Sequence, residues 1–132
     1  MKEYSHKGQK IALVVNPDDW KKGLDFLTED SLFIQVGTWW YNSGKTLQRH
    51  IHKKYERIAE RTMETIYVVS GSMRVDLYSE ERELIDDFVV QAGDLCVLMN
   101  GGHGYHILQD DTKILEVKNG PFTSVEDDKT KF

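Results

Sequence analysis

The sequence predicts an all-β fold. Short runs rich in β-branched and aromatic residues recur from residue 31 to residue 118, and such runs are typical of strands. Gly, Asn, Asp and Ser separate these runs at fairly regular intervals, which is typical of a sandwich or barrel. The only cysteine is Cys96, so no disulfide can form within the chain and a disulfide-built fold is excluded.

Composition favours one domain that comprises residues 1–132. The chain is 39% hydrophobic and 30% charged, with a formal net charge of -5 and no strongly basic stretch long enough to predict nucleic-acid or membrane binding. No signal peptide and no apolar run of transmembrane length is visible, so we expect a cytoplasmic protein.

The N-terminal part, about residues 11–28, predicts a strand followed by a short helix. Residues 11–15 are apolar and predict the strand. Asn16 and Pro17 fit the cap and first position of a helix, and Trp20, Leu24 and Leu27 follow at near-helical spacing. We therefore expect a helix over residues 17–28.

The remaining strands form the predicted barrel at about residues 31–119, and residues 120–132 predict a polar tail that lies over the surface or a partner. The runs that predict these strands are residues 32–41, 46–53, 64–69, 73–78, 84–90, 95–99, 105–108 and 113–118.

Four of the five histidines form two groups along the chain. His50 and His52 alternate with Ile51, so on a strand both rings point to the same face. His103 and His106 lie in a turn-rich break between two apolar runs. Because neutral imidazole is the commonest metal ligand, this pattern indicates a metal inside a β structure.

The stretch from Gly44 to Gly71 resembles the first motif of the cupin superfamily. Gly44 is followed by five residues and then by His50 and His52, and Glu64 is followed by six residues and then by Gly71. The family usually places three or four residues between the second histidine and the glutamate, whereas this chain has eleven. Glu56 stands at the shorter spacing but lacks the downstream glycine, so we favour Glu64 as the ligand.

The second cupin motif is matched less closely. Gly93 and Gly101 fall at motif glycines, but Met99 replaces the motif proline. The motif histidine falls at position 104, so His103 comes one residue early and His106 two residues late. We favour His103 as the fourth ligand and keep His106 as the alternative.

The resemblance implies a double-stranded β-helix, which is a jelly-roll barrel, and the fold commonly forms a homodimer. His50, His52, Glu64 and His103 would hold one divalent metal, with Fe, Mn, Ni, Co and Zn all compatible. The implied function is a metal-dependent small-molecule enzyme, a dioxygenase or an isomerase or epimerase, acting on a sugar, a sugar nucleotide or a small carboxylic acid. The alternative is a non-catalytic cupin that binds or senses a small ligand.

The alternation of side chains along a strand adds further residues to the predicted pocket. Gln48 shares a face with the first histidine pair, and Tyr105 shares a face with His103. We expect Gln48, Tyr105 and His106 to line the substrate pocket.

Overall fold

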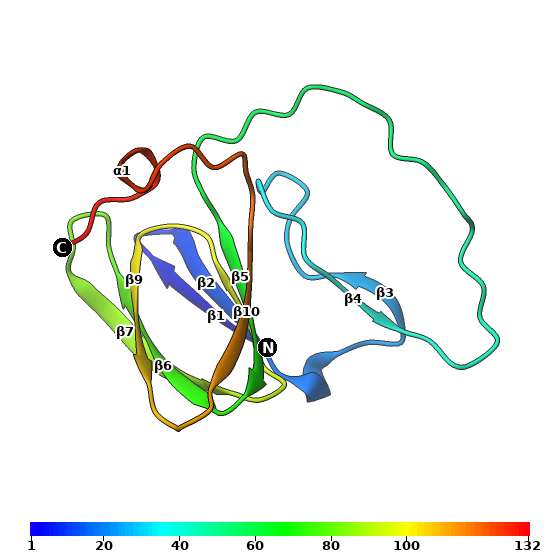
Figure 1. The fold of residues 1–132 in the computed structure, drawn as a ribbon, viewed down its shortest axis with the longest axis horizontal. Coiled ribbons are helices and arrows are strands. Elements are labelled where there is room, and N and C mark those ends of the chain that lie inside the picture. Colours follow the sequence, from blue (N-terminus) through cyan, green and yellow to red (C-terminus); the bar gives the residue numbers. More distant parts are fainter.

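The computed structural model describes residues 1–132 and confirms the all-β fold class, with three antiparallel sheets and almost no helix (Figure 1). The elements are β1 Lys2–His6, β2 Gln9–Val15, a 3-10 turn at Pro17–Asp19, β3 Gly23–Phe26, β4 Gly37–Trp40, β5 Glu64–Ser70, β6 Ser72–Tyr78, β7 Leu84–Gln91, β8 Leu95–Leu98, β9 Gly102–Ile107, β10 Lys113–Lys118 and α1 Val125–Asp128.

Two sheets face each other around the main core. The five-stranded sheet has the order β1-β2-β8-β5-β10, and the three-stranded sheet has the order β7-β6-β9. Ile66 and Val68 from the first sheet pack in one buried cluster with Val75 and Leu77 from the second. Burial of these apolar side chains, which are at most 1% exposed, is the main force that holds the sheets together.

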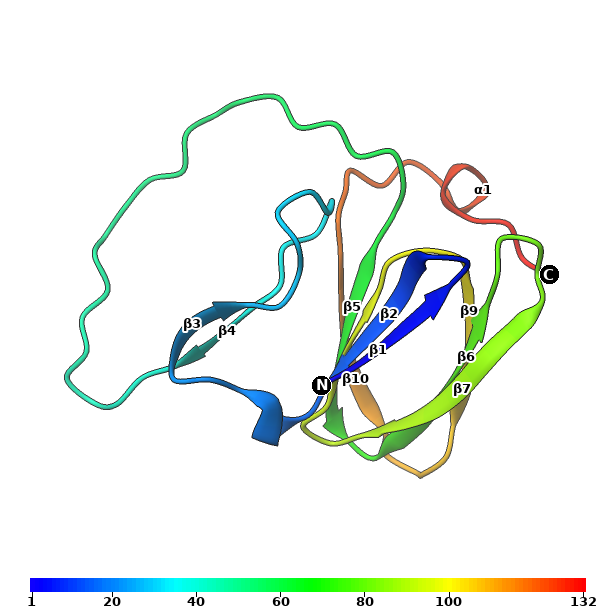
Figure 2. The ribbon, with the colours of Figure 1, turned by 180° about the vertical axis from the view of Figure 1, so that it is seen from behind.

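A second core lies on the outer face of the five-stranded sheet. The loop between β3 and β4 places Ile34 and Val36 against Leu13, Val15 and Val97. The β3–β4 hairpin is thereby fixed beside the larger sheet, as both views show (Figures 1 and 2).

The predicted helix over residues 17–28 is wrong. Asn16 does begin a helical turn, in which its backbone N–H donates to Asp19 Oδ2 at 2.9 Å, but the turn ends at Asp19. Gly23 then has φ +97°, which a right-handed helix cannot contain. Leu24 and Phe26 alternate on strand β3, which pairs with β4.

The segment 41–62, which we call the arm, forms a wide arc beside the hairpin (Figures 1 and 2). The strand predicted over residues 46–53 lies in the arm and does not form there. The structure also contains no helix whose length and hydrophobicity would let it span a membrane.

Candidate functional site

A hollow of about 1160 Å³ lies where β5 begins, β6 ends and β9 begins. The C-terminal segment from Asn119 to Phe132 forms part of its wall. Only six of its 27 lining residues are hydrophobic, so the hollow suits a polar small molecule rather than an apolar one.

Glu64 is the first residue of β5 and lines the hollow. Alternation along the strand places Glu64, Ile66 and Val68 on the buried face. Glu64 is only 5% exposed. A carboxylate so deeply buried needs hydrogen-bond partners.

His103 and Tyr105 supply those partners from β9. His103 stands opposite Leu77 and Tyr105 opposite Val75 in the β6–β9 register, so both lie on the face of β9 that turns toward the five-stranded sheet. Tyr105 is nevertheless 40% exposed. His103 Nε2 lies 3.0 Å from Glu64 Oε2. The Tyr105 hydroxyl donates to the same carboxylate oxygen at 3.3 Å.

The charges of the site keep Glu64 ionised and Tyr105 neutral. The hydrogen bond from His103 lowers the pKa of Glu64, against the opposing effect of burial, and Lys129 and Lys118 act in the same direction as His103. Burial, followed by the charge of Glu64, raises the pKa of Tyr105. The phenol therefore stays a hydrogen-bond donor at neutral pH, and the carboxylate stays an acceptor.

The lowered pKa of Glu64 predicts a pH-dependent stability. Ionised Glu64 stabilises the fold above the ordinary carboxyl pKa of 4.5, and this stabilisation is lost as the pH falls through the lower pKa of the folded state. We expect urea unfolding of the wild type to weaken below about pH 4.5 more steeply than that of Glu64→Gln, because glutamine cannot ionise. Parallel curves for the two proteins would contradict this prediction.

The predicted ligands of the first histidine pair lie elsewhere. Gln48, His50 and His52 are all exposed on the arm. The two imidazole rings lie edge to face with centroids 4.9 Å apart, and His50 Nδ1 donates to the Gln48 carbonyl at 3.1 Å. The structure therefore brings Glu64, His103 and Tyr105 together, and it does not bring His50 and His52 to them.

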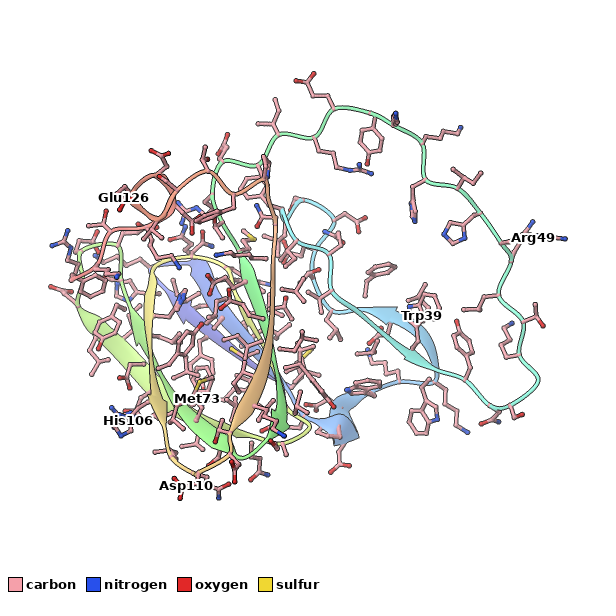
Figure 3. All side chains as sticks on the ribbon, viewed as in Figure 1. Trp39, Arg49, Met73, His106, Asp110 and Glu126 are labelled. Atoms are coloured by element: carbon pink, nitrogen blue, oxygen red, sulfur yellow. The ribbon has the colours of Figure 1, made fainter.

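His106 also lies away from the hollow. It stands opposite Arg74 in the register and is exposed on the outer face of β9, opposite to the face that carries His103. Figure 3 shows it on the outside of the sheets. Of the three residues predicted to line the substrate pocket, only Tyr105 contacts the site.

Sequence reasoning missed the contribution of the tail to the hollow. The ring of Phe132 packs edge to face on Tyr78 at 5.2 Å, and both residues line the hollow. Lys129 lies in the same wall. The polar composition of residues 120–132 gives no periodic pattern that could have placed them there.

The residues as arranged do not fit a bound metal. No group of three or more His, Cys, Asp or Glu side chains comes together, and the site itself offers only Glu64 and His103 as ligands.

Comparison of the chain with models of known families, with curated proteins and with solved structures finds no match.

Proposed function

We propose that the chain is a small-molecule enzyme that moves a proton on a polar substrate bound in the hollow. The observation that carries this proposal is a buried, ionised carboxylate in contact with an imidazole at a polar cavity. Titratable groups perturbed by specific partners inside a cavity are typical of acid–base sites. Isomerase or epimerase chemistry on a sugar, a sugar nucleotide or a small carboxylic acid fits this arrangement.

Each residue of the site has a distinct role in the proposed proton transfer. Ionised Glu64 can only accept hydrogen bonds, so the proton between it and His103 belongs to Nε2. Nδ1 of His103 is then the ring atom that can accept a proton from the substrate. Tyr105 holds the carboxylate in place as a positioning residue. The lysines at 118 and 129 add positive charge that attracts an acidic substrate.

The fold proposed for this enzyme is a jelly-roll barrel of the cupin type. The face-to-face sheets with a hollow at one end support this assignment. Gly71 also supports it, because this motif glycine forms the β5–β6 turn at φ +78°, a conformation that favours glycine.

A test of the proposal is proton exchange in deuterated water. Sugars, sugar nucleotides and small hydroxy and keto acids are incubated with the protein, and loss of the carbon-bound proton is followed by NMR. We expect Glu64→Gln and His103→Asn each to slow exchange by about 10²–10⁴-fold.

The matched control is His106→Asn, which changes a histidine on the outer face of the same strand. We expect it to exchange at the wild-type rate. Equal loss in the control, or full activity in Glu64→Gln, would contradict the assignment. A compound that binds at Glu64 and His103 without exchange would instead identify a non-catalytic binding protein.

A divalent metal held by His50, His52, Glu64 and His103 stays a prediction of the sequence. Elemental analysis of untagged protein tests it directly. Near-stoichiometric metal that disappears in a variant with His50→Ala and His52→Ala would support the prediction, and protein that is purified metal-free and fails to take up added metal would contradict it.

A further inference from the structure

The β5 and β10 half of the outer face of the five-stranded sheet is covered only beside Tyr67, which shares a small hollow with Trp39 and Trp40 of β4. The loop between β3 and β4 covers the β2 and β8 half through Ile34 and Val36. The β5 and β10 half carries four exposed apolar side chains, which we call the patch: Tyr67 at 36%, Val69 at 55%, Leu115 at 55% and Val117 at 51% exposure. Tyr67 and Leu115 stand directly opposite each other in the strand register, so the patch is continuous across the two strands.

The arm is the second apolar surface without a partner. Every residue from 39 to 61 is exposed, and Ile51, Tyr55 and Ile58 are 94%, 66% and 77% exposed. Between residues 43 and 60 the hydrogen bonds are local, from Lys45 N to Asn42 O and from His50 Nδ1 to Gln48 O. Large side chains exposed to this degree on an unsupported segment indicate a surface that is buried against something else.

The arm and the patch of one chain lie apart. In both views the β3–β4 hairpin lies between the arc of the arm and strands β5 and β10 (Figures 1 and 2). Figure 3 shows the arm around Arg49 far from the paired sheets. The arm therefore reaches outward, toward a neighbouring molecule, more readily than toward its own patch.

Charge favours a second copy of this chain as that neighbour. The arm contains six basic and two acidic residues and so has a formal charge of +4, whereas the whole chain has -5. The rest of each copy is therefore strongly acidic, and it attracts the arm of another copy.

We propose that two copies of the chain exchange arms, so that the arm of each copy docks on the patch of the other. Twofold symmetry makes every arm–patch contact twice. A stable interface buries about 800 Å² on each partner. In the proposed dimer each copy buries both its arm and its patch, so both surfaces contribute to that area. This inference is independent of the chemistry proposed for Glu64 and His103.

The test is the mass of the protein in solution, measured by light scattering during size exclusion. We expect a dimer for the wild type and a monomer for both Ile51→Asp in the arm and Leu115→Lys in the patch. The matched control is Val89→Lys, on β7 of the other sheet, because Val89 is 57% exposed and lies outside both surfaces. We expect the control to remain a dimer.

A mixture of the two monomeric variants gives the sharper result. The Leu115→Lys chain keeps an intact arm and the Ile51→Asp chain keeps an intact patch, so one contact is restored and the other pairs Asp with Lys. We expect the mixture to form a heterodimer, seen by native mass spectrometry when one chain carries a mass label. Circular dichroism confirms that each variant is folded.

Several outcomes would overturn the proposal. A monomeric wild type would show that the arm has no partner in a second copy. A dimer that survives Ile51→Asp but not Leu115→Lys would indicate patch-to-patch contact instead. A dimer that survives Leu115→Lys, or a mixture that stays monomeric, would exclude the exchange of arms.

Discussion

Replacing Gly101 with alanine is expected to destabilise the fold by about 2–5 kcal/mol. Gly101 precedes β9 and has φ +69°, where a side chain is strained. A Cβ there would lie 2.2 Å from the Tyr78 carbonyl oxygen, which is a backbone atom and cannot move aside cheaply. Because Tyr78 ends β6 and pairs with Gly102, the clash separates the strands next to His103. Urea unfolding measures the loss.

Gly8→Ala is the matched control for this prediction. Gly8 has φ +80°, but a Cβ there would meet nothing within 4 Å. We expect only the backbone strain of about 1–2 kcal/mol. If both variants lost the same stability, the close approach at Tyr78 would not matter.

Leu77→Ala is expected to cost about 2–5 kcal/mol of stability. Leu77 is fully buried in the main core, where it packs with Val75 and Leu98. Removing its side chain leaves a cavity that close-packed neighbours fill only in part. The cavity would lie opposite His103, so we also expect the NMR signals of the His103 ring to shift.

Leu84→Ala serves as the control, since Leu84 is 60% exposed at the start of the neighbouring strand β7. Its stability should stay within about 0.5 kcal/mol of the wild type. Thermal or urea unfolding of the two variants side by side tests the difference. A small loss for Leu77→Ala would mean that the two sheets are less tightly packed than the structure indicates.

The sequence was most informative from β5 onward. Residues 64–69 predicted a strand through their run of β-branched and aromatic residues. The structure places Ile66 and Val68 on the buried face of that strand and leaves Tyr67 and Val69 exposed. The bounds of β10 were predicted as the structure has them, Lys113–Lys118.

The N-terminal part was less predictable. Strand β1 was missed, because it lies at the edge of the sheet and only Tyr4 is buried, which gives no apolar pattern. Strand β3 was predicted as helix because Trp20, Leu24 and Leu27 match a helical period by chance. The positive φ of Gly23 decides against that period.

The site was predictable in its residues and less so in its assembly. The sequence predicts that His103 and Tyr105 lie on the same face of their strand. Their contact with Glu64, however, depends on which strands become neighbours. That choice is made by the packing of the two sheets, with β6 beside β9 and β8 beside β5. The His50 and His52 pattern on the arm carries no such tertiary contact.

The burial of Cys96 has a practical consequence. Its side chain is only 1% exposed, and burial raises the pKa of the thiol to about 12. At neutral pH it is therefore inert toward maleimides and nitroxide reagents. A single cysteine introduced at the tip of the 41–62 segment can accept a spin label selectively, so pulsed EPR distances are within reach without first removing the native thiol.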